Sequence, residues 1–297
     1  MNITEKFKGT GVAIVTPFRT DGTVDMPALS RIVNHIIQGG CNYIVALGTT
    51  GESVTLTADE KKMVKAGIVE ATAGRVPLML GIGGNNTASL VQQLKTESIE
   101  GFDAILSVSP YYNKPNQEGL FRHYTALADA SPKPVLLYNV PGRTGMNMTA
   151  ETTLRLASHG HIFGIKEASG NFDQCMEIIK NKPKDFMVIS GDDAYTLPFV
   201  SLGMDGVISV VANAYPHLFS SMVKKALDGA FASARIMHYE LTETIKLMFS
   251  DGSPGGVKAY LKLMQLCEDT VRLPLAPVNA SVQARIVKDF ERLQKQA

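Results

Sequence analysis

The chain has 297 residues, of which 45% are hydrophobic and 19% are charged. Its 29 lysines and arginines nearly balance its 28 aspartates and glutamates, which argues against a dedicated nucleic-acid-binding protein. The first residues lack the apolar core of a signal peptide, and no apolar run approaches the roughly 20 residues that cross a bilayer. Three widely spaced cysteines predict reduced thiols. We therefore expect a cytoplasmic globular protein that binds neither nucleic acid nor membrane.

Eight short apolar segments have the character of β-strands bounded by Gly, Pro or Asn. They span residues 11–16, 43–47, 77–81, 104–108, 134–138, 162–167, 187–190 and 206–210. Most are continuously apolar, which is typical of strands that are covered on both faces. Each of the seven links has room for a crossover helix of about a dozen residues.

The segments between these strands show helical signals. Apolar residues recur at helical spacing over residues 29–36, and Gly39 and Gly40 follow them as a stop signal. Thr57 and Glu60 have the spacing of a capping box, in which each side chain satisfies a backbone N–H at the start of a helix. Eight alternating units predict an α/β fold of the (β/α)8 TIM-barrel type, with a doubly wound open sheet as the alternative.

The pattern changes after the eighth strand. From about residue 216 onward only helical periodicity is found, and the prolines of residues 272–277 forbid one continuous helix there. We expect a catalytic barrel over residues 1–229 and a C-terminal helical domain over residues 230–297. The helices of that domain would pack on the barrel or on a neighbouring subunit.

Lys166 is the strongest candidate for a catalytic group. It is the only lysine or arginine within a predicted strand, in the sequence GIKEASG at 164–170. An apolar strand removes water from the amine and disfavours its charged form, so the amine can attack a ketone and form a Schiff base. The alternative is an ion pair with Glu167 or with an aspartate elsewhere in the barrel.

Two further candidates follow the fifth strand, within YNVPGRTG at 138–145. Tyr138 ends the strand that precedes the strand of Lys166, so the two side chains are expected to share the barrel mouth and exchange protons. Arg143 offers a forked donor for a substrate carboxylate. A core tyrosine and a solvated loop arginine are the corresponding structural alternatives.

Other strand ends carry polar or small residues. Thr49 and Thr50 follow the second strand in GTTGES, which suits a small carboxylate and lacks the GK[ST] of a phosphate-binding loop. Tyr111 and Tyr112 lie in SPYYNKP, where we expect one tyrosine to face the site and the other a partner.

The last two strand ends contribute small and acidic residues. Gly191 and Ile208 would shape a small pocket there. Asp192 and Asp193 lack a third ligand, so we expect no metal.

Taken together, GTTGE at 48–52, SPYYNKP at 109–115, YNVPGRTG, GIKEASG and SGDD at 190–193 resemble the dihydrodipicolinate synthase family. The resemblance runs in order along nearly the whole chain, including LPLAP near the C-terminus. It implies a Schiff-base lyase of the class I aldolase type that condenses pyruvate with L-aspartate 4-semialdehyde in lysine and diaminopimelate biosynthesis. It also implies no metal or organic cofactor, and a homotetramer built as a dimer of dimers.

The resemblance also implies a role for each site residue. Lys166 matches the Schiff-base lysine. Tyr138 resembles the proton donor and acceptor, connected through Thr49 to Tyr112 of a neighbouring subunit. The remaining matches are to substrate-binding positions, with Thr50, Ile208 and the nearby Gly191 for pyruvate and Arg143 for the semialdehyde carboxylate.

One group of positions departs from the pattern of lysine-inhibited relatives. Those relatives place two histidines and a glutamate in an effector pocket, where this chain has Ala58, Lys61 and Ser89. Loss of a carboxylate and gain of an ammonium group should repel a cation, so we predict weak or absent feedback by lysine.

Rival functions are N-acetylneuraminate lyase and 2-keto-3-deoxy sugar-acid aldolase, which share the lysine and the tyrosine. The paired threonines and Arg143 argue against them. A catalytically silent barrel that senses pyruvate or an amino acid is a third possibility.

Overall fold

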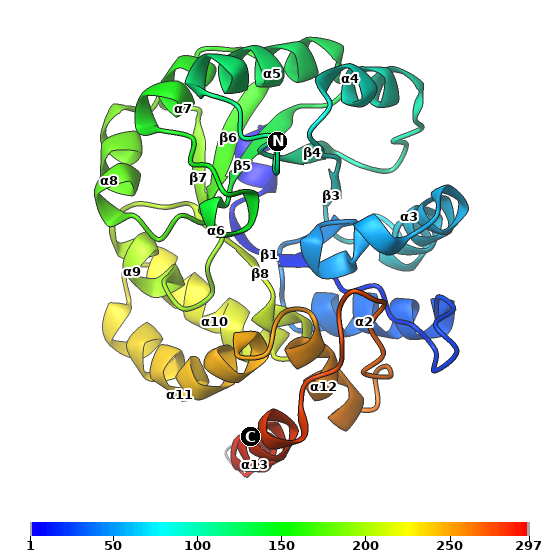
Figure 1. Ribbon diagram of the computed structural model, residues 1–297. Helices are drawn as coiled ribbons and strands as arrows, with labels where there is room; N and C mark the ends of the chain where they lie inside the picture. Colours follow the sequence, from blue (N-terminus) through cyan, green and yellow to red (C-terminus); the bar gives the residue numbers. More distant parts are fainter. Residues whose placement is uncertain (1, 296–297) are drawn as a thin grey trace.

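The computed structural model describes residues 2–295 and contains a closed barrel of eight parallel strands, paired in sequence order (Figure 1). The strands are β1 (Gly9–Ala13), β2 (Tyr43–Ala46), β3 (Leu78–Gly81), β4 (Ala104–Val108), β5 (Val135–Asn139), β6 (Ile162–Glu167), β7 (Met187–Ser190) and β8 (Gly206–Ser209). β8 pairs with β1 and closes the barrel. The predicted barrel is confirmed, and the alternative of an open sheet is wrong.

Seven strands begin and end within one residue of their predicted limits, but the first lies two to three residues earlier than expected. The extended chain leaves the sheet before Val15, whose N–H donates to the side chain of Asn213 at 3.1 Å. The apolar segment extends beyond the end of β1 because its last residues are buried by a loop and not by strand pairing. The predicted strand was therefore placed too late in the sequence.

Helices surround the barrel. They are α2 (Met26–Gln38), α3 (Ala58–Thr72), α4 (Thr87–Thr96), α5 (Gln117–Ala130), α7 (Ala150–Leu156), α8 (Phe172–Asn181), α9 (Thr196–Ser201) and α10 (Pro216–Leu227). Single turns occur at α1 (Ile3–Lys6), α6 (Pro141–Thr144), η1 (Thr49–Gly51), η2 (Ser53–Thr55) and η3 (Val211–Asn213). The capping box of α3 is confirmed: Glu60 N–H donates to Thr57 Oγ1 at 3.2 Å, and Thr57 N–H donates to Glu60 Oε2 at 2.9 Å.

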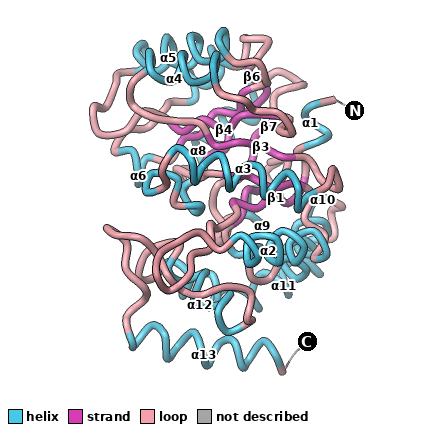
Figure 2. Tube along the Cα trace, turned by 90° about the vertical axis from the view of Figure 1, so that its right-hand side faces the viewer, coloured by secondary structure: helices cyan, strands magenta, loops and turns pink. Residues whose placement is uncertain are grey.

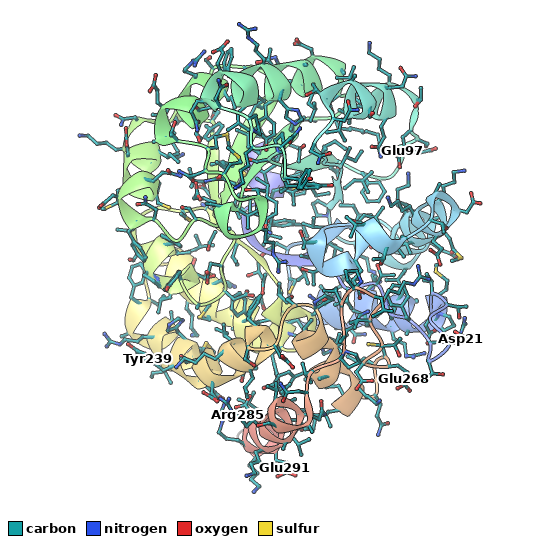
Figure 3. The ribbon with its side chains drawn as sticks, in the orientation of Figure 1. Asp21, Glu97, Tyr239, Glu268, Arg285 and Glu291 are labelled. Atoms are coloured by element: carbon teal, nitrogen blue, oxygen red, sulfur yellow. The ribbon has the colours of Figure 1, made fainter. Side chains whose placement is uncertain are left out.

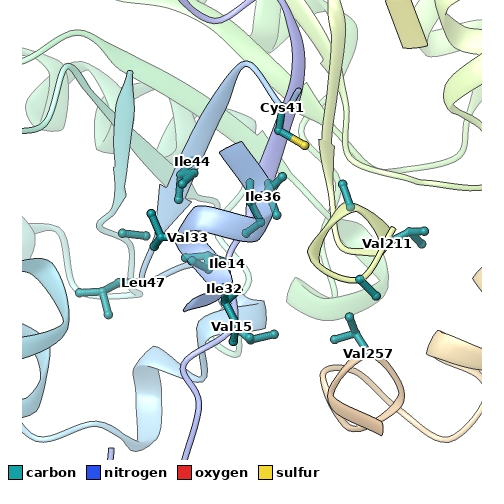
Figure 4. Close-up of a cluster of buried hydrophobic side chains, with 14 of the residues drawn as sticks. Ile14, Val15, Ile32, Val33, Ile36, Cys41, Ile44, Leu47, Val211 and Val257 are labelled. Carbon is teal, nitrogen blue, oxygen red and sulfur yellow. The ribbon is translucent and has the colours of Figure 1, made fainter. Parts of the chain in front are cut away.

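The apolar face of α2 packs against the barrel, and α2 ends directly before Gly39 as predicted. In Figure 4, Ile32 and Ile36 of α2 lie in one buried cluster with Ile44 of β2 and Val211. Val257, which comes from the C-terminal part of the chain, belongs to the same cluster. Full burial of such a side chain stabilises the fold by about 1.5–3 kcal/mol, so this cluster holds the C-terminal part on the barrel.

The C-terminal part contains α11 (Phe231–Phe249), α12 (Gly255–Leu263) and α13 (Ala280–Gln294). Residues 264–279 connect the last two helices without a helix of their own, as the prolines predicted. Figure 2 shows α12 and α13 beyond one side of the barrel, with α13 outermost. The division after residue 229 falls between α10 and α11, which pack on each other, and it stays a prediction.

The N-terminal mouth of the barrel is filled by aromatic side chains. Phe7 is fully buried, and its ring centroid lies 5.1 Å from that of Tyr43 and 5.8 Å from that of Phe163. Access to the barrel interior is therefore from the opposite, C-terminal mouth. Among residues 2–295, no helix combines the length and the apolar character that crossing a membrane requires.

Candidate active site

The C-terminal mouth of the barrel opens into a cavity of about 610 Å³. Seven of the eight site residues expected from the sequence line it, and only Tyr112 does not. The seven are Thr49, Thr50, Tyr138, Arg143, Lys166, Gly191 and Ile208. Residues from five strand ends thus meet at one place, as the barrel architecture dictates.

Lys166 and Tyr138 occupy facing positions on adjacent strands. Their Cα atoms are register partners in the β5–β6 pair, and Lys166 Nζ lies 4.2 Å from the centroid of the Tyr138 ring. Both side chains are buried, with exposed fractions of 6% for Lys166 and 8% for Tyr138. An amine held against a phenol at the base of the cavity is suited to attack on a small ketone with proton exchange beside it.

The alternative ion pair between Lys166 and Glu167 is wrong. Successive side chains of a strand point to opposite faces, and Glu167 bonds to groups outside the barrel. Its carboxylate accepts from Asn139 Nδ2 at 3.1 Å, Gln174 Nε2 at 2.9 Å and Ser169 N–H at 2.7 Å. Burial raises the pKa of Glu167, and these hydrogen bonds oppose that rise. Within residues 2–295, no ion pair holds Lys166.

Gly191 leaves the space that the Lys166 side chain occupies. A Cβ at this position would lie 3.0 Å from Lys166 Cε and 2.6 Å from the Cβ of Ala168. The backbone N–H of Gly191 donates to Glu167 O at 2.8 Å, so the residue cannot easily move away. A glycine is therefore required here by the close approach of the lysine.

Thr49 and Thr50 lie in η1, the tight turn that follows β2. Thr50 is buried and Thr49 is exposed. The turn is held from the segment that follows β1, since Thr16 Oγ1 donates to Gly51 O at 2.7 Å. It ends at Glu52, which adopts a left-handed conformation with φ of 50°. This is an unusual backbone for a non-glycine residue, and the surrounding contacts must maintain it.

Arg143 lies in the four-residue helix α6, on the exposed rim of the cavity. No ion pair engages its guanidinium within the described part of the chain. The segment around it is anchored by Asn139, whose Oδ1 accepts from Met148 N–H at 3.0 Å and whose Nδ2 donates to Asn147 Oδ1 at 2.7 Å. A fixed rim with an unpaired guanidinium is suited to bind a carboxylate that enters the cavity.

Tyr111 and Tyr112 point in different directions, as expected. Tyr111 lines the cavity, whereas Tyr112 has an exposed fraction of 88% and a φ of 71°. An almost fully exposed tyrosine in a left-handed conformation contributes nothing to this chain's own core. The orientation is compatible with a hydroxyl that serves another molecule.

Asp193 is buried beside the cavity, and its Oδ2 accepts from the backbone N–H groups of Val210 at 3.0 Å and Val211 at 3.2 Å. Its Oδ1 has no hydrogen-bond partner. Burial raises the pKa of Asp193 to about 6. Among residues 2–295, the structure gathers no group of three or more His, Cys, Asp or Glu that could hold a metal ion.

Among the cavity-wall residues that sequence reasoning did not assign to the site, Phe249 and Ser253 come from farthest along the chain. Phe249 is the last residue of α11 and Ser253 lies between α11 and α12, about 40 residues beyond the last strand. No local pattern marked them, because a barrel site is sought at the strand ends. The C-terminal helices thus contribute directly to the site.

Comparison with known proteins agrees with this geometry. Residues 6–293 match the model of the dihydrodipicolinate synthetase family. The chain is 53% identical to the 4-hydroxy-tetrahydrodipicolinate synthase of Flavobacterium psychrophilum, covering 98% of this chain and 100% of that protein. It is 52% identical to the enzyme of the same name from Parabacteroides distasonis, covering 96% and 97% of the two chains.

Two solved structures also share the fold. The crystal structure of dihydrodipicolinate synthase from Thermotoga maritima has a TM-score of 0.93 at 36% identity, with 97% of this chain and 98% of that chain covered. The chloride-inhibited enzyme from Acinetobacter baumannii, solved in complex with pyruvate, has a TM-score of 0.91 at 38% identity, with 96% and 99% covered. The chain therefore belongs to the dihydrodipicolinate synthetase family and is a lyase of the class I aldolase type.

Proposed function

We propose that this chain is a 4-hydroxy-tetrahydrodipicolinate synthase that condenses pyruvate with L-aspartate 4-semialdehyde in lysine and diaminopimelate biosynthesis. The observation that carries the proposal is the buried amine of Lys166, 4.2 Å from the Tyr138 ring at the base of the cavity. The names of relatives about 50% identical over nearly the whole chain support the choice of substrates.

The reaction begins when the neutral amine of Lys166 attacks the ketone carbon of pyruvate. Loss of water gives an imine, which accepts the electron pair left when a methyl proton departs, so an enamine forms. The enamine carbon attacks the aldehyde carbon of the semialdehyde and forms the new carbon–carbon bond. The amino group of the former semialdehyde then attacks the imine carbon, displaces Lys166 and closes the ring.

Each of these steps moves a proton, which gives Tyr138 its role. Its side chain lies against the amine and can donate to the departing water and accept from the methyl group in turn. We assign Thr50, Ile208 and Gly191 to pyruvate, since they lie around the same base of the cavity. We assign Arg143 to the carboxylate of the semialdehyde, because it lies unpaired at the rim.

We further propose that the proton relay continues from Tyr138 through Thr49 to Tyr112 of a neighbouring subunit. The exposure of Thr49 and Tyr112 in the single chain supports this, since both would be covered in a dimer. On α11, Ile236 is 72% exposed and Tyr239 is 68% exposed, and these apolar side chains suit the contact between dimers. Figure 3 shows Tyr239 on the outer side of the molecule. The resulting assembly is a homotetramer.

A cytoplasmic location belongs to the same proposal. The three cysteines, Cys41, Cys175 and Cys267, are free and buried, and burial raises the pKa of each thiol to about 12. Such thiols are structural rather than reactive. The reaction itself calls for no metal or organic cofactor, since the imine supplies the electron sink.

Turnover decides between this proposal and its rivals. The purified chain is given pyruvate with L-aspartate 4-semialdehyde, and separately N-acetylneuraminate and a 2-keto-3-deoxy sugar acid. We expect condensation with the semialdehyde and no cleavage of the sugar acids. Faster cleavage of either sugar acid would replace the proposed function with an aldolase function, and no turnover of any substrate would favour a sensor.

A further inference from the structure

A fully buried ion pair joins the turn of Thr49 and Thr50 to the C-terminal helices. Lys258 of α12 and Glu52, which ends the turn, have side chains with 0% exposure, and Lys258 Nζ lies 2.5 Å from Glu52 Oε1. The two residues are 206 positions apart in the sequence. Neither residue lines the cavity.

The pair belongs to a larger polar cluster that is packed around one aromatic ring. Lys258 Nζ also donates to Thr270 O at 2.8 Å, and the N–H of Arg272 donates to Glu52 Oε2 at 3.0 Å. The Phe18 ring is covered on its faces by Lys258 Nζ at 4.3 Å and by the Arg272 guanidinium at 4.4 Å. Both Glu52 oxygens are therefore held from the C-terminal part of the chain.

Arg272 extends this cluster to the next helix of the barrel. Its guanidinium binds the carboxylate of Glu60 through two nitrogens, at 2.8 and 2.5 Å, and donates to Thr55 O at 2.9 Å. The segment that follows the threonine turn, from Glu52 to the start of α3, is thus fastened to the connector between α12 and α13. Planar, two-point contacts of this kind fix orientation as well as distance.

The gain in folding stability alone does not explain why this ion pair is buried. A buried ion pair often stabilises the folded state no more than well-packed apolar side chains of similar size would. It does fix the relative positions of the two charged residues. Here the geometry includes the left-handed conformation of Glu52, which is uncommon for a non-glycine residue and is held by the contacts to both of its carboxylate oxygens. The turn that Glu52 ends carries Thr49 and Thr50, and both threonines line the cavity.

We infer that Glu52 and Lys258 are positioning residues, through which the C-terminal helical region holds the two threonines in the geometry that binds pyruvate. The inference rests on the proposed function in taking pyruvate as the ligand of this turn. In this view the C-terminal region contributes to substrate binding in two ways. Phe249 and Ser253 form part of the cavity wall, and Lys258 holds the threonine turn in place. Burial lowers the pKa of Lys258 and the Glu52 carboxylate opposes that shift, so the charge of the lysine depends on its partner.

The test compares Lys258→Met, the double variant Glu52→Gln/Lys258→Met and the control Lys262→Met. Lys262 lies one turn further along α12 and makes only partly exposed ion pairs, with Glu268 and Asp269. Each variant is assayed for its melting temperature and for the pyruvate concentration that gives half-maximal trapping by borohydride at Lys166. Trapping requires pyruvate alone, so it is read independently of turnover with the semialdehyde.

We expect Lys258→Met to lower the melting temperature, because it leaves a buried carboxylate unpaired. The double variant leaves no unpaired buried charge and should recover most of that loss. In both, the half-maximal pyruvate concentration should rise roughly five- to tenfold, since the turn has lost its anchor. Lys262→Met should match the wild type in both measurements.

A double variant that traps pyruvate at the wild-type concentration would overturn the inference and leave the ion pair a purely structural feature. The double variant decides the matter if Lys258→Met alone does not fold. Wild-type protein that traps pyruvate at Lys166 but does not condense it with the semialdehyde would refute the proposed function and leave this inference standing.

Discussion

Replacement of Gly191 by alanine should disturb the reactive amine with a single methyl group. The new Cβ would lie 2.6 Å from Ala168 Cβ and 3.0 Å from Lys166 Cε, whereas carbon atoms in contact prefer 3.5–4.0 Å. Relief of both overlaps requires a shift of about 1 Å, shared between the strand end and the lysine. Overpacking of this size costs about 1–3 kcal/mol of stability, and a misplacement of about 1 Å can cost 100-fold in rate.

The assay is the rate of borohydride trapping at saturating pyruvate, together with the melting temperature. We expect a rate lower by roughly 10- to 100-fold and a melting temperature lower by a few degrees. Gly160→Ala is the matched control, because a Cβ at Gly160 meets nothing within 4 Å. A Gly191→Ala variant that traps pyruvate at the wild-type rate would refute the account of this glycine as the space for Lys166.

Three further predictions concern the interface, the pH dependence and the regulation. Tyr112→Phe should lower turnover by roughly 100-fold or more while gel filtration shows an unchanged assembly, and unchanged turnover would remove Tyr112 from the relay. Asp193 binds its proton more tightly in the folded chain, where its pKa is about 6 against 3.8, so its contribution to folding weakens by roughly 3 kcal/mol as the pH rises from about 4 to about 6. Asp193→Asn should flatten that slope in urea unfolding, and an unaltered slope would contradict the assignment. Lysine at sub-millimolar concentration should leave turnover unchanged, given Ala58, Lys61 and Ser89 at the effector positions, and inhibition in that range would contradict this.

Most of the fold could be predicted from the sequence, because each strand of a parallel barrel pairs with the next along the chain. The same rule placed Tyr138 beside Lys166, on neighbouring strands whose ends meet at one mouth. Alternation along a strand also explains why Glu167 faces away from its neighbour. Local pattern and strand order were sufficient for these residues.

Contacts between distant segments could not be predicted in this way. Glu52 and Lys258 carry no shared pattern, and it is the packing of α12 against the barrel that brings them together. A signal did exist, since Lys258 stands next to Val257 on a helix whose other residues are largely apolar and buried. A charged residue in such a stretch calls for a buried partner, but the sequence does not say which one.

The limits of the first strand were wrong for a related reason. An apolar run marks burial, and residues after β1 are buried by the loop that contains Asn213 rather than by strand pairing. The left-handed conformation of Tyr112 was equally invisible, because tyrosine has no preference for it. The apolar pattern of a sequence predicts which residues are buried more readily than it predicts their backbone conformation.

The central claim is that Lys166 forms the covalent intermediate with pyruvate. It is tested most directly by borohydride reduction of the protein with pyruvate, followed by peptide mass mapping of the wild type and of Lys166→Ala. We predict one stable pyruvate adduct on the peptide that contains Lys166, and neither adduct nor condensation in the variant. An adduct on any other lysine, or carbon–carbon bond formation by Lys166→Ala at the wild-type rate, would contradict the account.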